Sequence, residues 1–364
     1  METCSVHTAF VHDRGGLTRI GQIPDMNKIS WERVADDISF CDITLYNPGP
    51  DCTELLNLLE PARHEIVVYR GDTRVWEGPL TLLTYSRDTV EIQARDVMHY
   101  AYRLAQSQEY DNRYPNITTC IQRSLTMLTH ELGRREVEDP PINVVPFLRA
   151  IDQPGDSKTS RRTLIYQKTV FDDIDDMAAN SGMDYTVIGR SILLHDTDTA
   201  LGKTATLTEA DIIGEVIVTS YGMEMGTFAV VTGTDGAWGE AGGSDPYYGR
   251  WEIVDDAYDE AEGTDAHTQA ELNYQAIRNL SGRVPTPVQV RVPDGSRIRP
   301  GSAITIDDLV PGVLVPLRAT LTARTFSQMQ KLRKLRVLED GSGEQVQITL
   351  VPAPLNSHLP DETP

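Results

Sequence analysis

The 364-residue sequence has little cysteine and no long apolar run. It holds four cysteines and no C-x-x-C pair, so we expect free, mostly buried thiols rather than disulfides or a zinc site. No stretch approaches the roughly 18 consecutive apolar residues of a membrane-spanning helix. Residues 1–16 are polar and lack the apolar segment of a signal peptide, so the chain is expected to fold in the cytoplasm that makes it.

Positive charge is also scarce. Lys and Arg number 33 against 54 Asp and Glu, which gives a net charge of −21 at pH 7. This acidity argues against a surface that binds nucleic acid by neutralising phosphates. It is compatible with a channel wall that DNA passes without sticking, because like charges repel. The simpler alternative, that the acidity keeps the protein soluble, remains open.

The compact motifs of common enzymes are missing. No G-x-S-x-G elbow occurs, and the glycine-rich stretch 239–243 lacks the Lys-Ser/Thr pair of a phosphate-binding loop. His64-Glu65 is not followed by a second histidine at helical spacing, which excludes a zinc-protease site. We therefore predict no catalytic, cofactor-binding or metal-binding residues.

Two acidic clusters are candidates for a charged surface. The run from Asp172 to Asp176 has the composition of a helix start, where carboxylates favour the positive end of the helix dipole. The second cluster is denser and favours a solvated or lumen-facing acidic surface over a calcium or magnesium site. Its members are Asp255, Asp256, Asp259, Glu260, Glu262 and Asp265.

One glycine-rich loop, 233–249, contains three aromatic residues, and a fourth follows it closely. Aromatic side chains often anchor interfaces, although in β-proteins they are more often part of the core. The glycine-rich setting favours an interface loop that could bind a partner or a sugar. The candidate residues are Trp238, Tyr247, Tyr248 and Trp251.

The apolar pattern predicts mostly short strands. Alternation over 38–46 and a hairpin around Gly71-Asp72 predict a meander that continues to residue 94. Two helices are predicted over 96–105 and 116–132, and a long exposed connection over 138–162. An amphipathic helix from Val170 and a hairpin around Gly189-Arg190 follow. Strands then dominate, including 303–306, with one helix over 265–280 whose inward residues are Ala270, Tyr274, Ile277 and Leu280.

These elements predict a mainly β fold with α+β elements. We expect two β-barrel domains of the tube type, a small α+β insertion and a helical connection. The expected division is a first barrel over 1–110, a helix and extended connection over 111–162, an insertion over 163–214, a second barrel over 215–352 and a flexible tail over 353–364. Trp76 is expected in the core of the first barrel, and Trp31 where the chain enters that barrel.

Six segments together resemble minor tail proteins of siphophages that infect actinobacteria, in the tail hub family that includes the baseplate hub of contractile-tailed phages. The matching segments are 31–39, 69–71, 75–79, 90–97, 182–190 and 309–313. They begin with Trp-Glu-Arg-Val at Trp31 and include Val-Trp-Glu-Gly-Pro at Val75. They cover most of the chain from about residue 30 to 350.

The resemblance implies a structural role in the virion, at the tail tip. It implies a homotrimer in which two barrels per subunit form six, matching the sixfold tail tube and lining the channel through which DNA leaves. Implied partners are the distal tail or tube protein, the tape measure protein and tip fibres. Many hubs carry a lytic domain after the second barrel. The chain ends soon after Pro352, which favours a purely structural hub.

Two other functions remain open at this point. A tail-associated cell-wall hydrolase would use carboxylates of the acidic clusters as acid and base. A receptor- or carbohydrate-binding tip protein would use the loop from Gly233 to Trp251.

Overall fold

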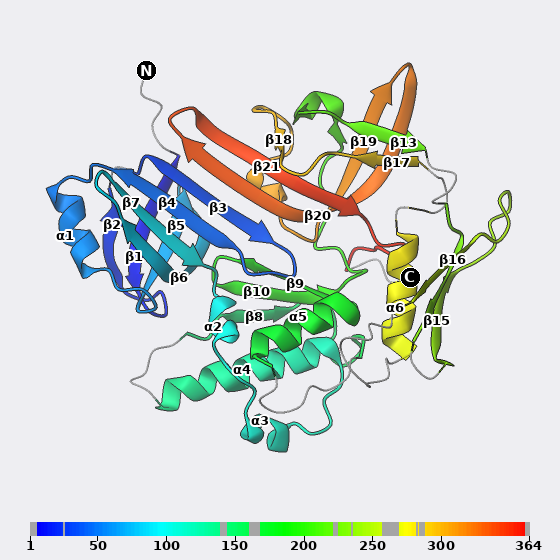
Figure 1. The fold of residues 1–364 in the computed structure, drawn as a ribbon, viewed down its shortest axis with the longest axis horizontal. Coiled ribbons are helices and arrows are strands. Elements are labelled where there is room, and N and C mark those ends of the chain that lie inside the picture. Colours follow the sequence, from blue (N-terminus) through cyan, green and yellow to red (C-terminus); the bar gives the residue numbers. More distant parts are fainter. Residues whose placement is uncertain are drawn as a thin grey trace.

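The computed structural model describes residues 6–24, 26–138, 144–159, 168–220, 225–233, 236–256, 269–281, 283 and 288–360. The fold is mainly β, with large antiparallel sheets and small helical parts, as the apolar pattern predicts (Figure 1). Thirteen strands form one continuous sheet, in which we distinguish a first and a second β half.

The first β half follows the predicted meander and adds strands before it. The neighbour order is β2-β1-β5-β6-β7-β4-β3, and every pairing is antiparallel. A nine-residue helix, α1 (Pro50–Leu58), covers its β2 side. The strands are β1 (His7–Asp13), β2 (Arg19–Ile23), β3 (Lys28–Val34), β4 (Phe40–Tyr46), β5 (His64–Arg70), β6 (Thr73–Tyr85) and β7 (Thr89–Arg95).

The second β half comes from the C-terminal part of the chain. Its neighbour order is β12-β18-β21-β20-β19-β11, in which only the β11–β19 pair is parallel. Among the described pairings, none joins β2 to β3 or β11 to β12, so each curled half is open at one seam. The strands are β11 (Leu207–Thr208), β12 (Ile212–Ile213), β18 (Ser296–Ile298), β19 (Leu314–Leu321), β20 (Arg324–Asp340) and β21 (Gly343–Pro352).

The two halves are joined by the β3–β20 ladder. Six residue pairs form it, from Lys334↔Val34 to Glu339↔Ile29. Trp31 lies within this ladder opposite Val337, has no exposed surface, and donates its indole N–H to His7 Nε2 at 3.0 Å. Trp31 therefore lies in the ladder that joins the halves and also contacts His7, the first residue of β1. Its expected place where the chain enters the first barrel stays a prediction. Trp76 is buried in the same core, as predicted.

Below this sheet lies an α/β module, residues 97–138, 144–159 and 168–199, with a separate hydrophobic core (Figure 1). Its sheet has the order β8-β10-β9, with β9 (Met183–Ile188) and β10 (Ser191–Asp196) forming the predicted hairpin. The connection predicted to be irregular contains β8 (Phe147–Ala150), which pairs in parallel with β10. The helices are α2 (His99–Tyr102), α3 (Gln108–Arg113), α4 (Cys120–Glu138) and α5 (Val170–Asn180).

Two smaller units complete the fold. A ribbon of β13 (Ile217–Ser220) and β17 (Val288–Arg291) packs on β20 through two glutamines: Val290 N–H donates to Gln328 Oε1, and Gln330 Nε2 donates to Val290 O. The outer sheet, β15-β14-β16, packs on α6 around its own small core. Its elements are β14 (Phe228–Thr232), β15 (Trp238–Gly242), β16 (Glu252–Asp256) and α6 (Gln269–Leu280).

Several local predictions need correction. The stretch 303–306 is no strand, because a single-turn 3-10 helix forms at Ile306–Asp308, where Thr305 and Asp308 make a capping box. In α6 the fully buried stripe is Leu272, Ala276 and Leu280, while Ile277 is only half-buried. The start of that predicted helix, 265–268, lies outside the described residues. Cys41, Cys52 and Cys120 are buried thiols, as expected.

Candidate functional site at the junction of the β halves

A buried ion pair links the α/β module to the second β half. Lys331 of β20 donates from Nζ to Asp184 Oδ2 at 2.6 Å and to the carbonyl oxygen of Thr197 at 2.8 Å. Thr197 Oγ1 donates to the other carboxylate oxygen of Asp184 at 2.6 Å. The side chains of Lys331 and Asp184 are only 6% and 9% exposed, so both charges depend on each other for solvation.

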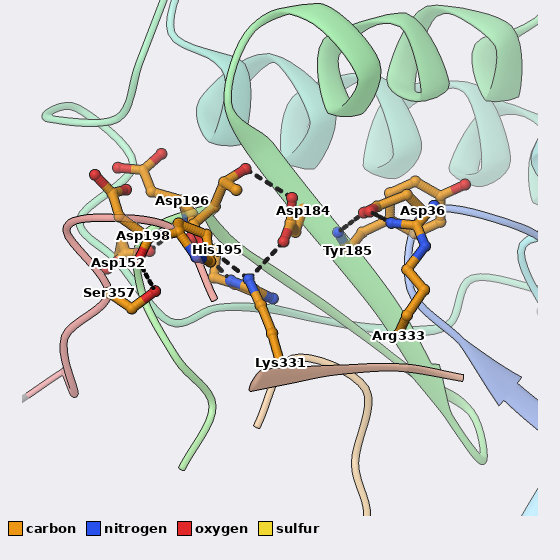
Figure 2. Close-up of polar contacts among 12 residues, drawn as sticks. Asp36, Asp152, Asp184, Tyr185, His195, Asp196, Asp198, Lys331, Arg333 and Ser357 are labelled. Atoms are coloured by element: carbon orange, nitrogen blue, oxygen red, sulfur yellow. Dashed lines mark hydrogen bonds and ion pairs between the residues drawn. The ribbon is translucent and has the colours of Figure 1, made fainter. Parts of the chain in front are cut away.

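A second ion pair lies two residues further along β20. Arg333 contacts Asp36, which follows β3, and Lys331 and Arg333 project from the same strand toward β9 (Figure 2). Asp36 also accepts the backbone N–H of Tyr185 at 2.8 Å, and its own N–H donates to the carbonyl oxygen of Tyr185 at 2.9 Å. Asp36 has φ +56°, a left-handed conformation that Asp tolerates better than most residues. The junction therefore joins both β halves to β9.

The pKa values of Asp36 and Asp184 are shifted in opposite directions. Burial raises the pKa of Asp36 to about 7, reinforced by the charge of Asp184 and opposed by Arg333. Burial also acts on Asp184, but the ammonium of Lys331 and the hydroxyl of Thr197 outweigh it and hold its pKa well below the usual range. Asp184 is thus a fixed negative charge, while Asp36 gains a proton near neutral pH.

The residues of both ion pairs line a pocket of about 460 Å³. Its walls come from α5, α6, β9, β20, the end of β21 and the segment that follows β3, so both β halves and the α/β module contribute. Asp175 and Arg278 line it beside the two ion pairs. Burial raises the pKa of Asp175, helped by Asp37 and Asp172. The pocket has a balanced set of acidic and basic side chains, as expected for a structural junction.

A third polar cluster lies where β10 ends. Asp152 accepts the N–H of Asp196 at 2.6 Å and the hydroxyl of Thr199 at 2.8 Å, and Lys158 pairs with Asp198 at 2.6 Å (Figure 2). Burial raises the pKa of Asp196 to about 6, with Lys158 opposing and Asp152 adding to the effect. This cluster binds the C-terminal segment.

The C-terminal segment returns to the α/β module. The N–H of His358 donates to the carbonyl oxygen of Asp198 at 2.9 Å, and that of Ala200 donates to the carbonyl oxygen of His358 at 2.8 Å. The sequence predicts a loose tail over 353–364, whereas residues 353–360 make these backbone contacts. Residues 361–364 lie outside the described part of the chain.

A fourth cluster is buried at the far end of the β9–β10 hairpin. Arg190 Nη1 donates to Glu65 Oε2 at 2.7 Å and to Glu77 Oε1 at 3.1 Å, and both glutamate side chains have no exposed surface. Arg74 pairs with Glu77, and Tyr100 OH donates to Glu65 Oε1 at 2.5 Å. Burial raises the pKa of Glu77 to about 7, with Arg74 and Arg190 opposing and Glu65 contributing.

The residues predicted from sequence lie elsewhere. The four aromatic side chains are exposed, by 51% for Trp238, 86% for Tyr247, 37% for Tyr248 and 51% for Trp251. Tyr247 and Tyr248 contact edge to face with ring centroids 4.8 Å apart, and Asp245 Oδ1 accepts both of their backbone N–H groups. Among the described ring contacts, none brings either tryptophan to this pair. The interface role of this loop stays a prediction.

The second acidic cluster is described only at Asp255, which is exposed and accepts a hydrogen bond from Asn279 Nδ2 of α6 at 2.9 Å. The side chain of Asp256, and Asp259, Glu260, Glu262 and Asp265 altogether, lie outside the described residues. Its lumen-facing role stays a prediction.

The first acidic cluster does form a helix start. Thr169 and Asp172 form a capping box at α5, and Asp173 makes a buried ion pair with Arg123 at 2.6 Å. In the described residues, no group of three or more His, Cys, Asp or Glu side chains could hold a metal ion. No helix of the described chain is long and apolar enough to cross a membrane.

Sequence reasoning missed all the ion-pair clusters. One local feature pointed to a cluster. The predicted hairpin turn Gly189-Arg190 carries a basic residue, and in the structure the side chain of this Arg190 is buried in an ion pair with Glu65. Glu32 and Arg33 on β3 gave a contrary signal, because consecutive charged residues normally argue against a buried strand.

The sequence matches no protein-family model and no curated protein. The fold resembles solved tail proteins, among them three that match over nearly the full length of both chains. The tail protein from Neisseria meningitidis MC58 has a TM-score of 0.60 at 11% identity, covering 97% of this chain and 99% of that one. The 43 kDa tail protein of prophage MuSo2 from Shewanella oneidensis has a TM-score of 0.57 at 14% identity, covering 95% and 98%.

The third is prophage tail protein gp18 from Listeria monocytogenes EGD-e, with a TM-score of 0.54 at 11% identity and coverage of 94% of each chain. At these identities the likeness concerns the fold. The chain therefore has the fold of these tail proteins, two of which are prophage proteins.

Proposed function

We propose that this protein is a structural hub of a phage tail tip, in the virion and without catalytic activity of its own. The observation that carries the proposal is the likeness to phage tail proteins across 94 to 97% of the chain. We further propose that the tail belongs to a siphophage that infects actinobacteria, as the sequence resemblance implies.

The proposed assembly is a homotrimeric ring. Two curled β halves per chain become six around the axis, which adapts a threefold ring to the sixfold tube above. Among the described pairings β2, β11 and β12 each have a neighbouring strand on one side only, which supports this assembly because unpaired sheet edges favour a partner. Rings form when one surface patch of a chain binds a different patch of the next.

The proposed partners are the tube or distal tail protein, the tape measure protein and tip fibres. DNA would pass through the ring without specific binding. The net charge of −21 supports this passage, because an acidic wall repels DNA. The protein would be made in the host cytoplasm and incorporated into the tail tip.

The acidic residues give the hydrolase alternative little support. In the main pocket, Asp184 is the carboxyl group held ionised, and it is paired with Lys331 and Thr197, so it is not free to attack or to activate water. A glycosidase needs one carboxyl group that can protonate a bond and another that is free to attack or to activate water.

The exposed turn with Tyr247 supports a second candidate, a receptor- or carbohydrate-binding tip protein. The turn is held rigid by Asp245, and rigid aromatic side chains bind with little loss of conformational entropy. Binding to host glycans that is lost in Tyr247→Ala and Trp238→Ala would favour this candidate over a purely structural hub.

Native mass spectrometry of the purified chain tests the ring. We expect a species of three times 40.5 kDa at micromolar concentration. A monomer at every concentration up to about 100 times that level would contradict self-assembly of the ring.

A further inference from the structure

The outer sheet β15-β14-β16 has two edges, and α6 covers the β15 edge. Gln269 Nε2 of α6 donates to the carbonyl oxygen of Trp238 at 2.8 Å. Asn273 Oδ1 of the same helix accepts the backbone N–H of Glu240 at 3.2 Å. These two side chains bond to the edge as a neighbouring strand would. Figure 1 shows the outer sheet at one end of the molecule, with α6 on the side that faces the rest of the chain.

The opposite edge, formed by β16, carries open backbone groups. Phe228 N–H of β14 donates to the carbonyl oxygen of Trp251 at 3.0 Å, which fixes the direction of the backbone groups along β16. Because these groups alternate along a strand, those of Ile253 face β14, whereas the N–H and C=O of Glu252 and Val254 point away from it. Among the described hydrogen bonds, none reaches the backbone of Glu252 or Val254 on this side.

The side chains beside the β16 edge form an exposed surface with an apolar centre. Val254 is 70% exposed, and it lies in one row with Val230 of β14 and Glu240 of β15. This row is on the face away from α6, because the alternate residue Ile253 packs against the small core on α6. An open edge with an exposed valine is a template on which an extended segment can add a strand.

The charges beside this edge decide which segment it accepts. Glu252 is half exposed and pairs with Arg250 at 2.7 Å, and exposed pairs of this kind contribute little to stability, so the glutamate can change partner. The sequence 252–262 holds six Asp and Glu residues and no Lys or Arg. Pairing with the same strand of a second copy would set acidic residues opposite one another, which destabilises a strand pair. A segment with Lys or Arg on both sides of an apolar residue sets opposite charges there.

We propose that the free edge of β16 binds an extended basic segment of another protein, which adds to the outer sheet as a further strand. The apolar residue of that segment lies beside Val254, and a Lys or Arg two residues away lies beside Glu252. This inference goes beyond the proposed hub role. It concerns one edge of the single chain and holds whether or not three chains form a ring.

Binding of a labelled peptide to the full chain tests the edge. The probe is a fluorescent peptide of sequence Thr-Lys-Thr-Val-Thr-Lys-Thr, followed by fluorescence anisotropy at about 0.15 M salt, where attraction between distant charges is screened. The control peptide carries an N-methyl group on its valine, which removes the N–H that faces Val254 and keeps every charge. We expect saturable binding of the probe, and binding of the control that is weaker by about tenfold or more.

Two variants locate the binding site on β16. Val254→Pro removes an N–H from the free edge but no hydrogen bond between β16 and β14, and it should weaken binding by about tenfold or more. Glu252→Lys should weaken binding by about threefold or more, and should favour a probe in which Glu replaces both Lys residues. Its matched control is Glu60→Lys, which makes the same change in net charge at an exposed residue before β5 and should bind the probe as the parent does. If Val254→Pro lowers the melting temperature, Glu252→Lys decides the test.

Hydrogen exchange shows where the probe lies. We expect the amides of Glu252 and Val254 to exchange about tenfold or more slowly when the probe is bound, while residues 238–242 of β15 keep their rates because α6 already covers that edge. Protection of residues 252–256 in the free chain that is lost on dilution would mean that a second copy occupies the edge. That result would overturn the proposal, as would equal binding of the two peptides or no saturable binding of the probe up to about 1 mM.

Discussion

Lys331 and Asp184 lie 147 residues apart in sequence and form a buried ion pair of 2.6 Å. Replacing Lys331 with Met leaves Asp184 as a buried carboxylate without its cation. Breaking a buried pair from one side typically costs about 3–5 kcal/mol, and we expect a loss of that size in the free energy of unfolding, measured with urea. The double variant Lys331→Met/Asp184→Asn should recover at least half of it. Equal losses in both variants would show that the charge is not the cause.

Stability should fall as pH rises from about 6.5 to 8. Burial raises the pKa of Asp36, Glu77 and Asp96 to about 7 in the folded chain, above the ordinary values near 4 that hold after unfolding. Between these values the folded state binds more protons than the unfolded state, so each group stabilises the fold at the lower pH, and this contribution is lost as pH rises toward 7.

The lowered pKa of Asp184 acts only at lower pH, so it does not oppose this trend. The lowered pKa values of His64, His99 and His195 oppose it mainly below pH 6.5, where these imidazoles take up protons in the unfolded state. Thermal unfolding across the range, compared with Glu77→Gln, is the measurement. The variant should show a weaker dependence on pH. A stability that rises toward pH 8 would contradict the assignment of these groups.

The two classes of tryptophan should respond differently to substitution. Trp31 is fully buried, whereas Trp238 is 51% exposed. We expect Trp31→Ala to destabilise the fold by about 3–5 kcal/mol, as large-to-small changes in a core do. Trp238→Ala should change stability by less than about 0.5 kcal/mol. Urea unfolding followed by circular dichroism compares them, and a large loss in Trp238→Ala would mean that this side chain is part of a core.

Gly78 on β6 should not tolerate a side chain. A Cβ there would lie 1.7 Å from the carbonyl oxygen of Arg95, so the backbone of β6 or of the segment after β7 must move. We expect Gly78→Ala to destabilise by at least about 2 kcal/mol. The matched control is Gly49→Ala, where no atom lies within 4 Å of the added carbon and φ is −66°. Similar melting temperatures for the two variants would contradict the close approach at Gly78.

Local patterns in the sequence predicted the parts of the fold that local physics determines. The hairpins around Gly71-Asp72 and Gly189-Arg190 and the capped start of α5 are of this kind, because turn and capping preferences act over a few residues. The division into two barrels, an insertion and connections, with its exact boundaries, stays a prediction.

The missed elements share a physical reason. The strand β3 carries Glu32 and Arg33, which are buried because Lys334 and the carbonyl oxygen of Val75 solvate them. These partners lie far away in sequence, so the segment alone looks too polar for a central strand. The buried ion pairs could not be predicted for the same reason. Asp36 and Arg333, like Glu65 and Arg190, lie far apart in the sequence, and no local pattern links them.

A cryo-electron microscopy map of an assembled tail tip that contains this chain tests the central claim most directly. The account predicts three copies in a closed ring around the channel, with six curled β halves facing the tube. A single copy placed off the axis, or a ring whose channel is not bounded by this chain, would contradict it.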